Sequence, residues 1–385
     1  MNQKQQYRYL LLLLLFFAGA VSSCVKSFVP SLENDEELLV VDGQITDAPG
    51  PYTVRLSKSS RLKQLAKNDP YTNCRVELED DRGANVRLTE QKPGIYQTDS
   101  LAIQGIPGRA YKLIISTPAG ERYESEPEVL LKGVQIQSVY GEVEHKSDPR
   151  LFYGRDGYQF YVDTEPTPEN NYLLWRMECT YKFKADYTIS CYYDKGLHFV
   201  YRPDSLRICY RTQNILQTYL LNTHELRQSG IKRFALYFED NYSKALTFRY
   251  SLKAYQLTLS KKAFTYWNAI KKIQDEGGEL YAQQPFQVAN NLRNRTNPDK
   301  PALGYFMAAG ISEKRIFITP ASFEIKVGKC ILDELQYKPF LQFKDNPELW
   351  PVFFTGTFDF PLYVDPECLD CRTKGELVPP SFWIE

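Results

Sequence analysis

The sequence predicts a mainly β protein: an N-terminal immunoglobulin-like β-sandwich followed by a larger β-rich domain with one packed helix. Three observations predict this fold class. Short segments in which apolar and polar residues alternate recur between Gly- and Pro-rich turns. Aromatic residues make up 14% of the chain, with 28 Tyr but only 3 Met, and aromatic side chains pack well on pleated sheets. Only one segment shows a convincing helical period.

The chain begins with a segment typical of a bacterial export signal. Lys4 and Arg8 precede an apolar run of about 12 residues, whereas a helix needs roughly 20 to cross a membrane. The next residues, Val21-Ser22-Ser23-Cys24, resemble the bacterial lipobox, in which the cysteine is lipidated and becomes the new N-terminus. We expect residues 1–23 to be a signal peptide and residues 24–37 to be a tether whose Cys24 carries the lipid anchor. An ordinary signal peptide with an incidental Cys24 is the alternative.

Residues 38–128 carry the strand pattern that predicts the sandwich. Tyr52–Ser57 and Cys74–Glu79 alternate at period two, and Ala110–Ile115 forms a further apolar strand. Turn clusters such as Ala48–Pro51 separate these segments. Because no long helical period interrupts the series, we expect an immunoglobulin-like β-sandwich.

Residues 129–385 predict the larger β-rich domain. Their strands are longer and more aromatic, as in Tyr172–Tyr181, and a helix is expected near residues 260–276 with Ser260 as its N-cap. The apolar stripe of this helix lies on one side, so the helix is expected to pack on a sheet. The stripe consists of Phe264, Trp267 and Ile270.

Two further segments of this domain have weaker patterns. Residues 280–301 are rich in Asn, Gln and Pro and are expected to form a loop. A second, shorter helix is expected to start near Asn222. Neither segment carries a motif that would assign a function to it.

The charge balance argues against nucleic acid as a partner. Loss of residues 1–23 would remove Lys4 and Arg8 from 47 basic residues and leave all 47 acidic ones, so the mature net charge is near −2. No basic excess remains to neutralise phosphates. The 362 residues that are left suffice for two domains with sizeable cores.

Seven cysteines follow Cys24, and disulfides persist in the compartments to which proteins are exported. Because seven is odd, at least one thiol stays free or pairs between chains. Cys368-Leu369-Asp370-Cys371 lacks the second pair or nearby His of a zinc site, so we favour a structural disulfide that involves this pair. Cys179 and Cys191 could staple a hairpin. The candidates for disulfides are Cys179, Cys191, Cys209, Cys330, Cys368 and Cys371.

The sequence shows no catalytic motif. The three histidines, His145, His198 and His224, are isolated, and the chain contains no HExxH, G-x-S-x-G, P-loop or G-x-G-x-x-G motif. We therefore expect that the protein is not an enzyme and that it binds neither a metal ion nor a cofactor. Paired carboxylates for glycoside hydrolysis depend on spacing in the fold, so a glycan hydrolase is the less favoured alternative.

An aromatic tract at residues 187–201 is the one candidate for ligand contact. With a nearby tryptophan it could form a ligand platform, made of Trp175, Tyr192, Tyr193 and Tyr201. A solvent-edge hairpin or a core strand is the alternative that we favour, since aromatic side chains are common in both.

Several segments together resemble an uncharacterised family of Bacteroidota envelope lipoproteins, classed only as a domain of unknown function. The matching stretches occur in order over nearly the whole mature chain. They are Leu39–Thr46, Gly105–Tyr111, Tyr255–Ser260 leading to Trp267, Leu303–Phe306, Ser312–Phe317, Cys368–Arg372 and Pro380–Trp383. The family usually has two glycines after the arginine, and this chain has one, Gly375. Members of this family are commonly encoded beside TonB-dependent outer-membrane receptors, so the resemblance implies a role with such a receptor.

We expect an outer-membrane lipoprotein that is an accessory or ligand-binding partner of a TonB-dependent receptor in nutrient uptake. The alternative is a surface adhesin or structural envelope protein. Its ligand would be a small molecule, a peptide or a glycan. Acidic residues start only at Glu33, after Val25-Lys26-Ser27, so the sequence favours the cell surface over the periplasmic face only slightly.

Overall fold

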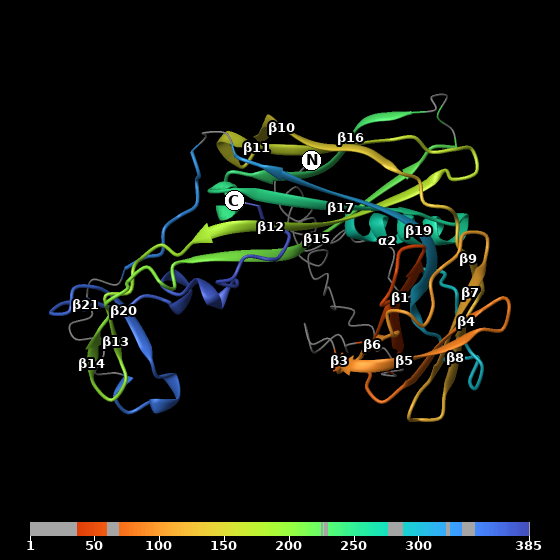
Figure 1. The fold of residues 1–385 in the computed structure, drawn as a ribbon, viewed down its shortest axis with the longest axis horizontal. Coiled ribbons are helices and arrows are strands. Elements are labelled where there is room, and N and C mark those ends of the chain that lie inside the picture. The colour runs from red at the N-terminus through yellow and green to blue at the C-terminus, as the bar shows by residue number, and fades with distance from the viewer. Residues whose placement is uncertain are drawn as a thin grey trace, which may run out of the picture. The chain divides into compact units, whose positions relative to one another are not determined.

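The computed structural model describes residues 37–59, 69–224, 226, 230–275, 288–320, 324–332 and 343–384. Over these residues the chain is mainly β with a single α-helix, which confirms the predicted fold class (Figure 1). The predicted signal peptide, Cys24 and nearly all of the tether lie outside the described residues. None of the helices described is long and apolar enough to span a membrane.

Short strands dominate the first part of the chain. In β2 the side chains of Val54 and Leu56 are buried and that of Arg55 is exposed, as the period-two pattern predicts. The immunoglobulin-like form of this part stays a prediction. Its strands are β1 (Leu39–Thr46), β2 (Thr53–Lys58), β3 (Asp69–Pro70), β4 (Arg75–Asp80), β5 (Asn85–Lys92), β6 (Ile95–Gln97), β7 (Ala110–Ser116), β8 (Arg122–Ser125) and β9 (Glu128–Val129).

Longer strands follow, together with the helix. They are β10 (Ile136–Asp148), β11 (Leu151–Thr164), β12 (Tyr172–Lys184), β13 (Cys191–Tyr193), β14 (Leu197–Phe199), β15 (Ile208–Asn222), β16 (Ile231–Asp240), β17 (Tyr250–Thr258), α2 (Lys261–Asp275), β18 (Leu292–Asn294), β19 (Leu303–Ile318), β20 (Val352–Gly356) and β21 (Pro361–Leu362). Short 3-10 turns occur at Lys244–Leu246, Pro347–Leu349, Pro366–Cys368 and Cys371–Thr373.

One long sheet connects the two parts, in the order β15-β12-β17-β19-β1-β2-β6-β5-β4-β7-β8-β18. β19 makes this connection because its first half pairs in parallel with β1 and its second half pairs antiparallel with β17. At Gly304 the backbone φ is +93° and a Cβ atom would lie 1.8 Å from the carbonyl oxygen of Val41, so only glycine fits at this position. Two smaller sheets, β10-β11-β16 and β14-β13-β20-β21, complete the strands described.

In the four-stranded stretch β15-β12-β17-β19, the inner strands β12 and β17 have buried residues on both faces. One face packs on β10-β11-β16 through a core that includes Phe160, Trp175 and Tyr250. The other face packs under α2 through a core that includes Leu174, Leu257 and Ala309. Figure 1 shows α2 running alongside β12, β15 and β17. The predicted helix is thus confirmed in place and in packing.

The N-cap of α2 is also confirmed. The amide N–H of Ala263 donates to Oγ of Ser260 at 3.1 Å, and the Ser260 hydroxyl donates to the buried carboxylate of Glu128. Phe264 and Trp267 of the predicted stripe pack against the sheet core. The start of the helix is therefore fixed to β9 of the first part of the chain.

Two expectations were wrong in detail. The expected loop at residues 280–301 contains β18, which pairs with β8 and places Leu292 in the N-terminal core. The helix expected near Asn222 is absent from the residues described there, because β15 continues through Asn222 in register with Tyr172 of β12. Both segments are held by long-range pairing, which local sequence patterns do not encode.

Candidate functional site

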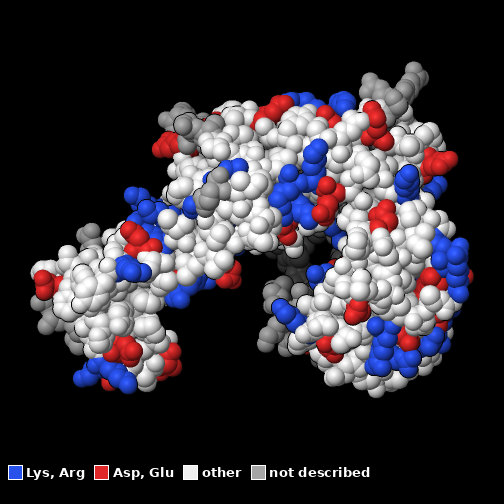
Figure 2. Space-filling model, viewed as in Figure 1, with Lys and Arg blue, Asp and Glu red and all other residues white. Residues whose placement is uncertain are grey.

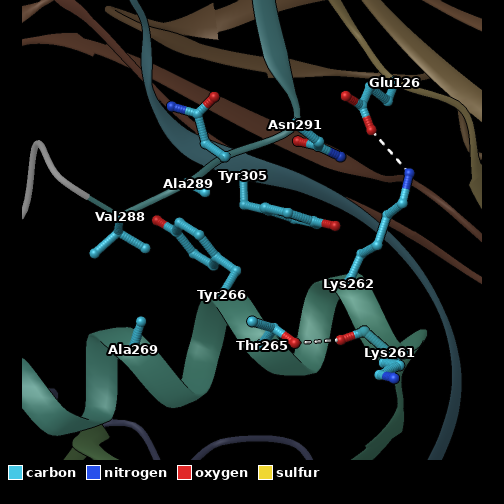
Figure 3. A pocket seen from close by; sticks show the side chains of 11 residues that line it. Glu126, Lys261, Lys262, Thr265, Tyr266, Ala269, Val288, Ala289, Asn291 and Tyr305 are labelled. Atoms are coloured by element: carbon cyan, nitrogen blue, oxygen red, sulfur yellow. Dashed lines mark hydrogen bonds and ion pairs between the residues drawn. The ribbon is translucent and has the colours of Figure 1, made fainter.

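Two cavities border α2, and they use different faces of the helix. The first, of about 520 Å³, is shown in Figure 3 and is called the Tyr305 cavity here. Lys262, Tyr266 and Ala269 of α2 form one wall, and Tyr305 of β19 and Asn291 form the other. The rings of Tyr266 and Tyr305 lie 4.8 Å apart.

Two charged groups of the Tyr305 cavity, Lys262 and Glu126, form an ion pair, whereas the third, Lys261, is exposed and has no ion pair among the described residues. Nζ of Lys262 lies 2.9 Å from the carboxylate of Glu126, which also faces Arg293 at 3.4 Å (Figure 3 draws the first pair). Behind the wall, Glu128 is 1% exposed and accepts hydrogen bonds from Tyr305, Ser260 and Asn291. Burial raises the pKa of Glu128, and these hydrogen bonds oppose the rise. A ligand that engaged Lys262 or Glu126 would have to compete with an ion pair that is already made.

The second cavity, of about 650 Å³, is called the Arg176 cavity. This volume lies within the range of about 300–1,000 Å³ that is usual for small-molecule sites. Its lining comes from six consecutive strands of the long sheet and from α2. The lining residues are Asp42, Gln44, Arg55, Arg176, Met177, Asn214, Ile215, Leu216, Gln217, Thr218, Tyr255, Leu257, Trp267, Gln274 and Ile311.

Arg176 has no carboxylate partner among the described residues. Its Nη1 donates to Oε1 of Gln44 at 3.1 Å, which uses one of the five N–H donors of a guanidinium. No described residue accepts a hydrogen bond from its other nitrogens, and the Arg176 side chain lines the cavity. Burial lowers the pKa of Arg176, Asp42 opposes this and Arg55 adds to it. The desolvation of this cation is thus not offset by a salt bridge.

A β-bulge explains why Arg176 faces open space. Trp175 pairs with Tyr219 of β15 and Met177 pairs with Ile215, so three β15 residues, 216–218, lie opposite Arg176 alone. These three residues line the cavity. Bulges re-aim side chains and occur often beside functional sites.

Trp267 of α2 forms the wall next to Arg176. The guanidinium carbon of Arg176 lies 4.8 Å from the centroid of the Trp267 ring, a cation–π distance. The indole N–H of Trp267 is buried and has no acceptor in the described part of the chain. A buried donor without an acceptor costs about 1–3 kcal/mol, so the wall holds a second unmet donor.

The rim of the Arg176 cavity carries the other two charges of the described lining. Asp42 of β1 and Arg55 of β2 are cross-strand partners, with 3.6 Å between Oδ2 and Nη1, and both side chains are more than half exposed. Since Asp42 and Arg55 compensate each other, Arg176 leaves the cavity with a net charge of +1. The rest of the described lining is apolar, amide, hydroxyl or aromatic.

The predicted aromatic platform was wrong. Trp175 is fully buried in the core, where its indole N–H donates to Oε1 of Gln256 at 3.0 Å. Tyr192 and Tyr193 are neighbours on β13 and therefore point to opposite faces; Tyr193 is buried, and Tyr192 stacks on His198 at 4.9 Å. Only Tyr201, at 90% exposed, is open to solvent. The four rings do not meet.

The cysteines form two disulfides among the described residues, Cys209–Cys371 and Cys330–Cys368. Cys368 and Cys371 of the CxxC thus both form structural disulfides, each with a partner from elsewhere in the chain. The expected Cys179–Cys191 disulfide was wrong. Both thiols are free: Cys179 lies in the core under β10-β11-β16, and Cys191 lies in the core of the sheet β14-β13-β20-β21. Burial raises the pKa of Cys179 to about 11, so its thiol is unreactive at neutral pH.

Sequence alternation holds no clear signal for Arg176. In β12 it shares a face with Leu174, Glu178 and Lys182, so apolar and charged side chains are mixed on this face. Arg176 differs from the other charges there only in its partners. Glu178, two residues further on the same face, has a partner in Arg315 at 3.0 Å. Trp267 was recognised only as part of the packing stripe.

Metal and charge patterns add no further site. In the described residues no cluster of three or more His, Cys, Asp or Glu side chains could hold a metal ion. On the face in Figure 2, basic and acidic side chains are interspersed, without a patch of one sign that would mark a polyanion-binding surface. The Arg176 cavity is therefore the candidate site with the most specific chemistry.

Comparison with known proteins agrees with the sequence resemblance. No curated relative matches the chain. The model of the family described as Domain of unknown function (DUF4249) matches residues 25–315, well over half of the chain. Arg176 and Trp267 lie inside the matched range, and the disulfide partners Cys330, Cys368 and Cys371 lie beyond it. This chain belongs to the DUF4249 family.

Proposed function

We propose that this chain is a non-enzymatic, lipid-anchored outer-membrane lipoprotein that holds a ligand for a TonB-dependent receptor in nutrient uptake. The Arg176 cavity carries the proposal, because it is roomy and is lined by a guanidinium with N–H donors that no described residue satisfies. The lipobox-like Val21–Cys24 supports the anchor. The resemblance to Bacteroidota envelope lipoproteins supports the receptor as partner.

The lining of the Arg176 cavity favours binding over catalysis. Its described residues include one carboxylate, Asp42, which is paired with Arg55, and no His, Cys or Ser. A glycosidase needs two carboxylates that flank the bond to be cleaved, and nucleophilic catalysis needs a nucleophile beside a base. A guanidinium with free donors in a mixed apolar and amide wall is suited to holding a ligand.

Recovery of partners from the outer membrane tests this function. The tagged chain would be purified from detergent-solubilised outer membranes and its partners identified by mass spectrometry. We expect a receptor barrel to co-purify in near-stoichiometric amount, and not with a tagged, unrelated outer-membrane lipoprotein. Recovery of the chain without any receptor barrel contradicts the proposal.

The lipid anchor has its own test. Metabolic labelling with a radioactive fatty acid should label the wild-type chain, and the Cys24→Ser variant should stay unlabelled and leave the membrane fraction. Protease treatment of whole cells then distinguishes the two membrane faces, and we expect cleavage without lysis. Protection until lysis would place the protein on the periplasmic side.

A surface adhesin is the second candidate, and one observation favours it. Aromatic side chains are exposed near the small sheet: Phe199 is 54% exposed and Tyr201 90%, with ring centroids 5.5 Å apart, and Phe358 lies 6.5 Å from Phe199. Exposed apolar clusters often mark interaction surfaces. A deletion strain separates the two functions: reduced growth on a limiting nutrient favours the receptor partner, and normal growth with poor attachment favours the adhesin.

A further inference from the structure

We propose that the Arg176 cavity binds a small organic monoanion through its carboxylate, with the uncharged remainder of the ligand on the apolar and amide wall. This inference rests on the proposed ligand-holding function and names the class of ligand. It starts from the charge of the cavity. Arg55 is neutralised by Asp42, so Arg176 is the one surplus cation of the described lining.

The hydrogen-bonding groups select the class of anion. A guanidinium presents a planar fork of donors that matches the two oxygens of a carboxylate. Gln44 accepts from one donor of this fork, at Nη1, and no described residue accepts from the others. A doubly charged anion would find only one uncompensated cation and would also face Asp42. The site is therefore matched to one negative charge.

The position of Arg176 is fixed before a ligand arrives. The Gln44 hydrogen bond and the Trp267 ring, 4.8 Å away, hold the guanidinium from two sides. Less side-chain freedom is then lost on binding, which favours affinity. The three β15 residues opposite Arg176, 216–218, line the cavity with it, so the anion has room between them.

The remainder of the ligand would lie on the far wall. Leu216, Leu257 and Ile311 supply apolar contact, and Asn214 and Gln217 supply amide groups. This mixture suits an uncharged body with a few polar atoms. Leu216 is 87% exposed although it borders the cavity, so it is free to cover a ligand.

A matched pair of probes tests the inference. The full mature chain in detergent would be titrated with 4-phenylbutyrate and with its neutral amide, up to about 10 mM, which covers weak small-ligand binding. Calorimetry and tryptophan fluorescence would report binding. We expect the carboxylate to bind at least about tenfold more tightly than the amide, because only the carboxylate engages the fork of Arg176. Inorganic phosphate should bind more weakly than the carboxylate.

Variants locate the site. Arg176→Gln should weaken carboxylate binding by about tenfold or more, and Arg176→Lys, which keeps the charge without the fork, should fall between it and wild type. Asp42→Asn should tighten binding severalfold by removing the nearby negative charge. Lys262→Gln, in the Tyr305 cavity, is the matched control and should bind as wild type does. Thermal unfolding would verify that each variant is folded.

Clear results would overturn the inference. Equal affinity for carboxylate and amide, unchanged binding by Arg176→Gln, tighter binding of phosphate, or no binding of the carboxylate would each do so. A chain that recovers the receptor but ignores the carboxylate refutes this inference and leaves the proposed function standing. A chain that binds the carboxylate but recovers no receptor refutes the receptor partnership alone.

Discussion

The Tyr305 cavity and the Arg176 cavity border the same helix, yet the most buried charged group beside each of them, Glu128 and Arg176, differs in its partners. In the first, Lys262 and Glu126 face each other and Glu128 is enclosed by three donors. In the second, Arg176 has one amide oxygen as its acceptor and no carboxylate partner in the part of the chain described. Paired polar groups stabilise a fold, whereas an unpaired buried charge costs stability. The difference leads us to expect that Glu128 stabilises the fold and that Arg176 does not.

The largest change in stability is expected when the carboxylate behind the Tyr305 cavity is removed. Glu128→Ala would leave the hydroxyls of Tyr305 and Ser260 without their acceptor in a buried place. We expect the free energy of unfolding to fall by about 2–4 kcal/mol. Urea unfolding followed by circular dichroism measures it. A loss below about 1 kcal/mol would show that the network is not structural.

Removal of the cation from the Arg176 cavity should not lower the free energy of unfolding. Arg176→Leu eliminates a desolvated charge that no described carboxylate compensates, so we expect the free energy of unfolding to stay unchanged or to rise by up to about 2 kcal/mol. The same urea experiment applies. A clear loss of stability would mean that Arg176 holds the fold together, and the contrast between the cavities would disappear.

The pH dependence of stability should differ between Glu128, behind the wall of the Tyr305 cavity, and Glu126, in its lining. The pKa of Glu128 is raised by burial, so wild-type stability falls as the pH rises from the ordinary value of 4.5 through the raised value. Glu128→Gln cannot titrate and should gain relative to wild type over this window, by at most about 1.4 kcal/mol per pH unit. Urea midpoints over a pH series measure the difference.

Glu126 supplies the matched control for that series. Its pKa is lowered chiefly by the hydrogen bond from Lys262, so its contribution is present above pH 4.5 and is lost as the pH falls through the lowered value. Glu126→Gln should therefore differ from wild type in the direction opposite to Glu128→Gln. Equal slopes for both variants would contradict the assignment of burial to Glu128.

The smallest effect is expected at Lys262. Its side chain is 69% exposed, and surface ion pairs contribute little because water and salt screen them. Lys262→Met should leave the unfolding midpoint within experimental error. A marked loss of stability would show that the wall of the Tyr305 cavity depends on this pair.

The sequence predicted the fold where side-chain periodicity decides it. Alternation identified β2 and β4, and a cap followed by a one-sided stripe identified α2 from Ser260 onward. The parallel pairing of β1 with β19 was beyond local patterns, because it joins residues such as Val41 and Gly304 from opposite ends of the matched region. The same limit applies to β18, a three-residue strand inside a polar tract.

The candidate site was harder to predict than the fold. Arg176 is notable only because β15 has a bulge opposite it and because its neighbours lie on β1 and α2. None of these relations is visible along the sequence. The prediction of an aromatic platform was wrong because the abundance of aromatic residues does not show on which face of a strand each ring lies. Trp175 and Arg176, adjacent in the chain, face a sealed core and an open cavity.

The pairing of β1 with β19 also has a mechanical consequence. β1 starts directly after the predicted tether, so tension on the lipid anchor would enter the described fold along this strand. Seven residue pairs, from Val40 to Thr46, join β1 to β19, and β2 holds its other edge. A force parallel to the strands must shear these ladders together, whereas a perpendicular force would unzip them one bond at a time. Tension along β1 from the proposed anchor would therefore load both ladders at once.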